Sequence, residues 1–337
     1  MTEHSKIPLP GEGEGDEVRS LFERASGTFG LDSFRAAPVP SHLVPPAAKR
    51  ASPAPEPLVT PAPVQEAAPA ASPAAMPETT VAEPAVVTPV EPAVQFTGGR
   101  HEIDRDRLCE RGMIVPEAGA TALLEEFRII KRQVIASADA AGDAAARRVL
   151  VCSPLPGDGK TFCATNLAIA MAGERDGEVV LVDADFAKPS VLSTLGLPKG
   201  PGLMDALADP SLKVEDLVMA TDIPGLFVLP AGNATNVDSE WLASARTAEV
   251  LDRLTRGAPK RMIVFDSPPA LAASPAADLA RHVGQAVLVA RADKTGRNAL
   301  EDAVQLLGAC PDIKLLLNGT HFSPSGRRFG TYYGYEG

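Results

Sequence analysis

Short apolar runs alternate with stretches of helical periodicity over most of the chain. Six runs dominated by apolar residues are typical of buried strands: Val149–Cys152, Val179–Val182, Leu226–Leu229, Met262–Phe265, Ala286–Ala290 and Ile313–Leu317. Between them, apolar residues recur at helical spacing near 162–173, 239–255, 274–282 and 296–309. Because parallel sheets are covered by helices on both faces, this alternation indicates βαβ units. We therefore predict an α/β fold, a doubly wound and mostly parallel sheet flanked by helices.

Two further stretches upstream carry apolar residues in a pattern. Residues Ala122 to Ile135 are predicted to form an amphipathic helix, whose apolar side holds Leu123, Leu124, Phe127, Ile130 and Val134. Residues Glu17 to Phe34 hold scattered apolar residues among charges, interrupted by glycine. That segment is either a short docking helix or a disordered terminus, and the pattern leaves both open.

Composition divides the chain into parts. Of the 32 prolines, 17 lie in the first 100 residues, where Pro/Ala runs recur without apolar periodicity. Such a segment cannot bury a core and is typical of an extended, disordered linker. We predict a short docking segment over 1–36, a Pro/Ala-rich linker over 37–100, a folded domain over 101–322 and a flexible tail over 323–337.

Charge and cysteine content exclude several classes of function. A formal net charge of −11 argues against nucleic-acid binding, which needs a basic surface. The four cysteines have no metal-ligand spacing and are expected to be buried, reduced residues: Cys109, Cys152, Cys163 and Cys310. No apolar run approaches the roughly 20 residues that span a bilayer, and no signal peptide is recognised. We expect a cytoplasmic protein that reaches the inner membrane peripherally, through a partner.

The segment from Ser153 to Thr161 has the composition of a phosphate-binding loop. It follows a predicted strand and precedes a predicted helix, so its backbone N–H groups and the helix N-terminus favour an anion. Lys160 can reach the phosphates of a nucleotide, and the Thr161 hydroxyl can bind Mg²⁺. A strict pattern needs glycine at position 154, where this chain has Pro154. The cradle itself is expected from Pro156, Gly157, Asp158, Gly159, Lys160, Thr161 and Phe162.

Carboxylates follow two of the predicted strands at the point where each strand ends. Asp183 and Asp185 come after Val179–Val182, and Asp266 comes after Met262–Phe265. Parallel strands end at one edge of the sheet, which is where doubly wound sheets bind their ligands. We therefore expect the three carboxylates beside the phosphate loop, where they can hold Mg²⁺ and orient a nucleophile.

These motifs together resemble the nucleotide motifs of the bacterial tyrosine autokinases of exopolysaccharide and capsule synthesis. The resemblance rests on the loop, on Asp183-Ala184-Asp185 with Lys188-Pro189, and on Asp266-Ser267-Pro268-Pro269. It covers essentially all of 120–320 and implies the fold of P-loop NTPases. Three upstream stretches are similar to the exosortase-associated subgroup of these kinases, namely Ile103–Leu108, Gly112–Pro116 and Glu125–Arg132.

The resemblance implies roles for individual residues. Lys160 would contact the phosphates of ATP, and Thr161 would bind Mg²⁺. Asp185 and Asp266 would bind or position this metal ion. Asp183 is then the candidate base for the incoming tyrosine, since a placed carboxylate can accept a phenol proton. Asn318, at the end of the last predicted strand, corresponds to the position that meets adenine.

The resemblance also implies the acceptor and the partners. All three tyrosines of the chain stand near its end, at Tyr332, Tyr333 and Tyr335, as family members have a tyrosine cluster that neighbouring subunits phosphorylate. Ring assembly in the family uses an E-x-x-R-x-x-R helix, whose places are held here by Glu125, Arg128 and Lys131. Expected partners are a membrane polysaccharide chain-length regulator as activator, further copies of the chain and a tyrosine phosphatase.

Two other functions are compatible with a phosphate loop on this fold. One is a switch ATPase resembling septum-site and plasmid-partition proteins, but their loop carries a signature lysine where this chain has Leu155. The other is a non-catalytic adaptor of a polysaccharide export complex, in which the nucleotide only tunes binding. The tyrosine cluster favours the autokinase over both.

Overall fold

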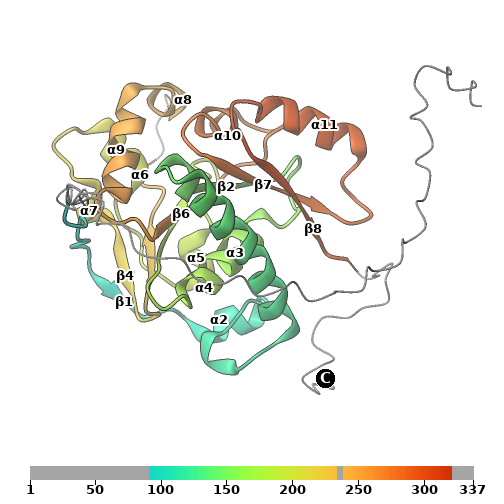
Figure 1. Ribbon diagram of the computed structural model, residues 1–337, viewed down its shortest axis with the longest axis horizontal. Helices are drawn as coiled ribbons and strands as arrows, with labels where there is room; N and C mark the ends of the chain where they lie inside the picture. Colours follow the sequence, from blue (N-terminus) through green and yellow to red (C-terminus); the bar gives the residue numbers. More distant parts are fainter. Residues whose placement is uncertain (1–90, 234–237, 321–337) are drawn as a thin grey trace, which may run out of the picture. The chain divides into compact units, whose positions relative to one another are not determined.

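The computed structural model describes residues 91–233 and 238–320, and these residues build one mostly parallel sheet with helices on both faces (Figure 1). The eight strands lie in the order β1-β4-β5-β3-β6-β2-β7-β8. Their bounds are β1 Arg100–His101, β2 Arg148–Cys152, β3 Glu178–Asp183, β4 Met219–Thr221, β5 Leu226–Leu229, β6 Arg261–Asp266, β7 Gln285–Arg291 and β8 Ile313–Asn318. The predicted fold class is confirmed.

Helices of very different length connect the strands. The longer ones are α3 Ala122–Ala141, α4 Lys160–Ala172, α9 Ala245–Thr255 and α11 Arg297–Leu306. The shorter ones are α2 Arg105–Glu110, α5 Val191–Leu195, α6 Leu203–Ala208, α7 Val214–Leu217, α8 Asp238–Leu242 and α10 Pro275–Leu279. Two 3₁₀ turns, η3 Pro116–Ala118 and η4 Ala145–Arg147, precede α3 and β2.

Each central strand contributes alternate side chains to two separate cores. Val149 and Val151 of β2 pack into the core under α3 and α4, whereas Leu150 and Cys152 pack into the core on the other face, with residues of α6, α9 and α10. The same alternation holds along β3, β6 and β7. A strand with period-2 side chains that is buried on both faces must be apolar throughout, which explains the continuous apolar runs in the sequence.

The register of the central strands places acidic residues side by side. In the β3–β6 pair Asp183 is opposite Asp266, and in the β2–β6 pair Val151 is opposite Asp266. The loop that follows β2 therefore leaves the sheet at the level of these carboxylates. This register brings the two strand-end motifs and the loop to one edge of the sheet.

The periphery differs from the sequence-based expectation in three places. The strands β1 and β4 are two and three residues long, too short for a periodic pattern, and β4 pairs with β5 in the antiparallel direction. The helix expected over 239–255 is divided into α8 and α9. At this break the Trp241 carbonyl accepts hydrogen bonds from the hydroxyls of Ser244 and Thr247, and such local bonds compete with helix continuation. The helix begun at Ala122 continues to Ala141, beyond the predicted Ile135.

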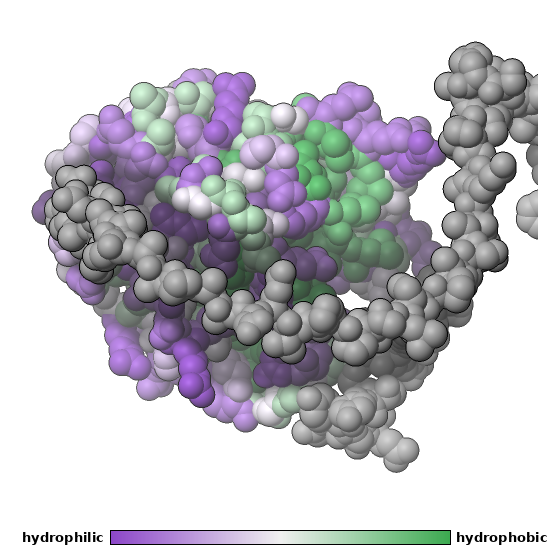
Figure 2. Space-filling model, in the orientation of Figure 1, coloured by the Kyte–Doolittle hydropathy of each residue, from purple (hydrophilic) through white to green (hydrophobic). Residues whose placement is uncertain are grey.

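The sheet ends on β8, an edge strand with an apolar surface. Leu315 and Leu317 of β8 are 62% and 56% exposed, and Figure 2 shows hydrophobic residues gathered below the polar surface of α11, in the region of β8. Within the described residues the outer edge of β8 is unpaired. Leu316, by contrast, packs against the core under α3 and α4.

Three of the four cysteines are buried, as expected, and Cys109 is exposed. Burial raises the pKa of the Cys152 thiol to about 11 and that of Cys163 to about 12, so both stay protonated at neutral pH. Over 91–233 and 238–320, no helix combines the length and the apolar character needed to cross a bilayer. The predicted parts 1–36 and 323–337, most of the predicted linker and the three tail tyrosines lie outside the described residues.

We predict that Gly202→Ala destabilises the fold by about 1–3 kcal/mol, the range for overpacking a tight site. A Cβ on Gly202 would meet the Pro230 carbonyl oxygen at 2.0 Å, where the backbone of α6 joins the segment after β5. The matched control is Gly173→Ala at the end of α4, where φ is −72° and the added Cβ makes an ordinary contact at 3.5 Å. Urea unfolding should show a lower free energy of unfolding for Gly202→Ala and not for Gly173→Ala. Equal unfolding midpoints for the two variants would contradict the close packing at Gly202.

Candidate functional site

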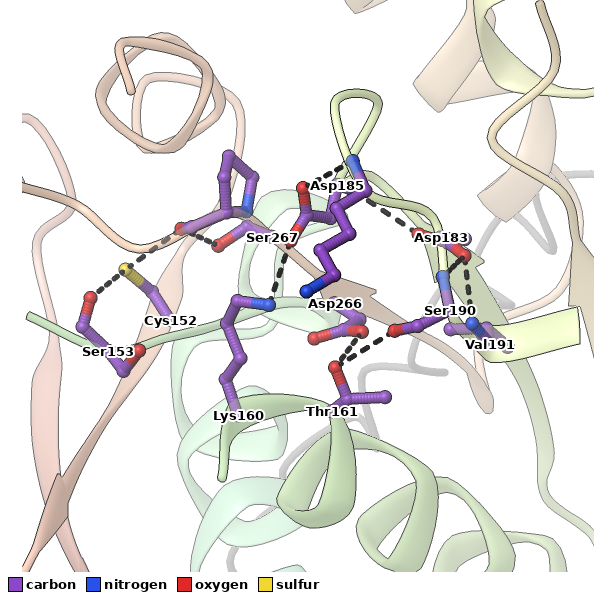
Figure 3. Close-up of polar contacts among 12 residues, drawn as sticks. Cys152, Ser153, Lys160, Thr161, Asp183, Asp185, Ser190, Val191, Asp266 and Ser267 are labelled. Atoms are coloured by element: carbon purple, nitrogen blue, oxygen red, sulfur yellow. Dashed lines mark hydrogen bonds and ion pairs between the residues drawn. The ribbon is translucent and has the colours of Figure 1, made fainter. Parts of the chain in front are cut away.

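The segment after β2 forms a glycine-dependent turn that leads into the N-terminus of α4 (Figure 3). Gly157 and Gly159 have φ of +87° and +97°, in the left-handed region that favours glycine. Gly159 is the N-cap of α4, and Lys160 and Thr161 are its first two residues. The first N–H groups of a helix have no intrahelical partner, so this turn presents backbone donors and a positive dipole end to an anion.

Lys160 pairs with an acid from the loop that follows β3. Its Nζ lies 2.8 Å from Oδ2 of Asp185, and both side chains are largely buried. Burial alone lowers the pKa of the Lys160 ammonium, but the carboxylates of Asp266, Asp185 and Asp183 outweigh burial and raise it. Lys160 therefore carries its charge at neutral pH and compensates the acids around it.

Asp266 is the most deeply buried acid of the site. Its Oδ2 accepts a hydrogen bond of 2.7 Å from the Thr161 hydroxyl, which also lies 3.3 Å from the hydroxyl of Ser190. Its Oδ1 is buried and has no hydrogen-bond partner among residues 91–233 and 238–320. Burial raises the pKa of this carboxyl to about 7, although Lys160 and Thr161 act in the opposite direction. A buried carboxylate oxygen without a partner is costly, and a ligand that supplies a positive charge would relieve it.

Asp183 lies at the same edge of the sheet as Asp266, but its carboxylate accepts hydrogen bonds from backbone N–H groups. Its Oδ2 accepts hydrogen bonds of 2.9 Å from the N–H groups of Ser190 and Val191. Figure 3 places these three residues on the far side of Asp185 and Asp266 from Lys160. Burial raises the pKa of Asp183 to about 6, and the backbone donors limit that rise. Asp183 thus closes the loop between β3 and α5, besides offering a carboxylate to the site.

The donor atoms fit Mg²⁺ bound together with phosphate oxygens better than a metal held by protein alone. Across the described ranges, no three His, Cys, Asp or Glu side chains converge as a metal site. The Thr161 hydroxyl, the unpartnered oxygen of Asp266 and the carboxylate of Asp185 nevertheless face one region. Magnesium usually keeps several waters and takes only one or two protein carboxylates beside phosphates, which agrees with this set.

The ends of β7 and β8 hold the loop in place. Asn318 Nδ2 donates to the Asp158 carbonyl at 2.9 Å, and Arg291 Nη1 donates to the Gly157 carbonyl at 3.2 Å. A Cβ on Gly159 would meet Asn318 Nδ2 at 2.1 Å, so the two residues are closely packed. Asn318 was predicted to lie at the nucleotide site, and the structure places its side chain on the loop itself.

The remaining cradle residues have mixed surroundings. Pro156 and Gly157 are exposed, whereas the carboxylate of the buried Asp158 accepts the Leu155 N–H at 3.3 Å. Phe162 points away from the cradle and packs edge-to-face on Phe127 of α3. Sequence reasoning did not select Ser190 or Arg291 for the site. Neither residue stands in a recognisable motif of its own. Only the tertiary fold brings Ser190 to Thr161 and Arg291 to Gly157.

The three residues of α3 that were predicted to mediate contacts between copies do not share one outward face. Glu125 and Arg128 form an ion pair with each other on the surface of the helix. Lys131 is buried and points toward α4, where its Nζ donates to the Ala170 carbonyl at 2.8 Å and pairs with Glu174 at 2.7 Å. The ammonium of Lys131 thus joins α3 to α4, and the contact between copies expected from Glu125, Arg128 and Lys131 stays a prediction.

Two sequence relatives of the chain carry the name of tyrosine-protein kinases. EpsB of Ralstonia solanacearum, a proposed tyrosine-protein kinase, is 33% identical over 205 residues, 57% of this chain and 26% of EpsB. Tyrosine-protein kinase YwqD of Bacillus subtilis is 29% identical over 236 residues, 69% of this chain and 94% of YwqD. The chain thus spans about a quarter of the length of the EpsB relatives and nearly all of YwqD. No protein-family model matches the chain.

A solved structure agrees with the sheet described above. The kinase domain of Escherichia coli tyrosine kinase ETK superposes with a TM-score of 0.51 at 21% identity, covering 66% of this chain and 92% of that domain. At this identity the likeness concerns the fold. The sequence relatives confirm the predicted resemblance to bacterial tyrosine-protein kinases, whereas the exosortase-associated subgroup stays a prediction.

We predict that Asp266 makes the stability of the chain fall as pH rises from about 4 to about 7. Its pKa is raised from 3.8 to about 7 in the fold, so in this window the folded chain retains a proton that the unfolded chain has released. One such proton contributes a slope of about −1.4 kcal/mol per pH unit to the free energy of unfolding.

The test compares urea unfolding of the wild-type chain and Asp266→Asn at several pH values. The variant keeps the size of the side chain and loses the titration, so its slope between pH 4 and 7 should be shallower by up to about 1.4 kcal/mol per pH unit. Parallel curves for the two proteins would show that Asp266 does not retain this proton.

Proposed function

We propose that this chain, a relative of the bacterial tyrosine-protein kinases, is an ATP-dependent protein-tyrosine autokinase whose acceptors are Tyr332, Tyr333 and Tyr335. The observation that carries the proposal is the Lys160–Asp185 ion pair beside the buried Asp266, at the N-terminus of the helix that follows a glycine turn. One edge of the sheet thus holds a cation that can bind phosphate, the Thr161 hydroxyl and the carboxylates of Asp185 and Asp266. The acceptors lie outside the described residues and are proposed from the sequence.

Phosphate binding would require Lys160 to exchange partners. The N–H groups of the turn and of the first residues of α4 would hold the β- and γ-phosphates, and the Lys160 ammonium would move from Asp185 to the phosphate oxygens. The carboxylate of Asp185 would then be free to take part in binding Mg²⁺. The 2.8 Å pair thus keeps both side chains compensated until the nucleotide arrives.

Magnesium, when bound, would neutralise charge on the β- and γ-phosphates as the phosphoryl group moves. The residues that would hold it are Thr161, Asp185 and Asp266. The role of Thr161 is supported by its hydroxyl, which is oriented by Asp266 and Ser190. The role of Asp266 is supported by its unpartnered oxygen.

In the reaction the Oη atom of an acceptor tyrosine would attack the γ-phosphorus as the bond from that phosphorus to the β,γ-bridging oxygen breaks. The phenol proton would pass to a carboxylate, and ADP would leave with the former bridging oxygen. Asp183 is the proposed acceptor of the proton, because its pKa of about 6 leaves it mostly ionised at neutral pH. Phosphotyrosine and ADP are the products.

The wider setting is also part of the proposal. The three tyrosines follow β8 in the sequence, and we propose that copies of the chain phosphorylate one another there within an oligomer. A membrane chain-length regulator of exopolysaccharide synthesis would activate the kinase and hold it at the inner membrane, and a tyrosine phosphatase would reverse the modification. Regulation of exopolysaccharide export would follow from cycles of phosphorylation and release.

We predict that Lys160→Met lowers phosphotransfer at least about 10²- to 10³-fold, the usual effect of removing one preorganised electrostatic donor. Purified full-length chain is incubated with Mg·ATP, alone and with membranes of the producing organism, and phosphotyrosine is mapped by mass spectrometry. The matched control is Lys213→Met, which removes an exposed lysine before α7.

Lys160-dependent phosphate on Tyr332, Tyr333 or Tyr335 is the expected result. Absence of such phosphate under both conditions would refute the autokinase. Lys160-dependent release of inorganic phosphate without phosphotyrosine would favour the switch ATPase instead, and nucleotide binding without either product would favour the adaptor.

A further inference from the structure

A cavity of about 520 Å³ opens at the edge of the sheet where β3 and β5 end. It lies over the ends of β3 and β5, where Asp183 and the segment Pro230–Asn233 form part of its lining. Its volume is within the range of about 300–1,000 Å³ that is usual for ligand sites. Asp183 therefore borders both the phosphate site and this cavity.

The walls of the cavity are suited to an aromatic ring. Apolar surface is supplied by Phe186 and Pro189 of the loop after β3, by Leu192 of α5 and by Leu197, which follows α5. Phe186 and Leu197 are themselves buried, so this surface is built into the fold. An apolar slot bordered by a carboxylate matches a phenol, which has an apolar body and a hydroxyl that must find an acceptor.

The charged residues of the lining are one acid and two bases. Besides Asp183, the cavity is lined by Arg107 of α2 and by Lys199. The Arg107 side chain is half exposed and held in place, since its Nε pairs with Asp104 at 2.9 Å and its Nη1 donates to the Ser193 carbonyl at 3.2 Å. Its Nη2 and the exposed Lys199 ammonium have no partner among the residues the structure describes.

Resting on the proposed function, we infer that this cavity receives the acceptor tyrosine, and that Arg107 and Lys199 select a tyrosine followed within two residues by a negatively charged group. The cations lie around an apolar slot, where they would meet the residues that flank an inserted ring. Hydrogen bonds between such cations and a carboxylate or phosphate are stronger than neutral ones. The ligand class is therefore an acidic tyrosine peptide.

Applied to this chain, the selection predicts an order of phosphorylation. Glu336 directly follows Tyr335, whereas Tyr332 and Tyr333 are followed by tyrosine and glycine residues. Tyr335 is then the first acceptor. Its phosphate adds close to two negative charges at neutral pH, which would make Tyr333, two residues before it, the next suitable acceptor. Phosphate on Tyr333 would in turn favour Tyr332.

The test uses full-length chains as both enzyme and acceptor. Wild-type chain phosphorylates a ¹⁵N-labelled Lys160→Met chain, so the peptides of the acceptor are distinguished by mass and each tyrosine is followed over time. A second acceptor carries Lys160→Met with Glu336→Gln. We expect Tyr335 to be labelled first, and we expect the KM for the acceptor with Glu336→Gln to rise roughly three- to tenfold with kcat unchanged, as for one lost hydrogen bond at a solvent-exposed site.

The enzyme is then changed to Arg107→Gln/Lys199→Gln. Its KM values for the two acceptors should become equal, because the groups that distinguish them are gone. A charge-retaining variant, Arg107→Lys/Lys199→Arg, should still prefer the acceptor that keeps Glu336. The matched control Lys213→Gln/Arg281→Gln removes two exposed cations that do not line the cavity and should keep the full preference.

Two results would overturn the inference while leaving the kinase intact: an Arg107→Gln/Lys199→Gln enzyme that still distinguishes the acceptors, or labelling that does not begin at Tyr335. A complete lack of Lys160-dependent phosphotyrosine would instead refute the proposed function, and the inference with it. Circular dichroism and nucleotide binding of each enzyme variant verify that it is folded.

Discussion

The buried acids at the ends of β3 and β6 are the constraint on which the rest of the site depends. Register places Asp183 directly opposite Asp266, and Asp185 follows two residues later. Like charges this close and this buried are unfavourable unless a cation compensates them. Lys160 is that cation, and it reaches the acids from the first turn of α4, the helix that follows β2.

The need to hold Lys160 beside the buried acids explains the structure around the loop. The turn before α4 has to be tight, so Gly157 and Gly159 take left-handed conformations, and side chains from the ends of β7 and β8 hold its carbonyls. The helix itself is fixed from the other side by α3, through Lys131 and the Phe127–Phe162 ring contact. Within the part of the chain that the structure describes, compensation is incomplete, because one oxygen of Asp266 has no hydrogen-bond partner there. The site is therefore arranged to gain stability when a ligand brings further positive charge.

Much of this arrangement could be predicted from the sequence, for identifiable reasons. Strands buried on both faces are continuous apolar runs, so the six main strands and the carboxylates at their ends were predicted. The strands β1 and β4 were not, since two or three residues carry no periodicity. The direction in which a side chain points could not be predicted from the sequence either. Nothing in the spacing of Glu125, Arg128 and Lys131 distinguishes the inward lysine from its neighbours, and Ser190 and Arg291 reach the loop only through the tertiary fold. The roles assigned to the site residues and the tail tyrosines stay predictions.

A crystal structure of the chain with Mg²⁺ and a non-hydrolysable ATP analogue would show directly whether Lys160 exchanges partners. We expect Lys160 Nζ to leave Asp185 and to lie within hydrogen-bonding distance of the phosphate oxygens, with a metal ion beside Thr161 and Asp266. A nucleotide bound elsewhere, or bound here with the Lys160–Asp185 pair still at 2.8 Å, would contradict this expectation.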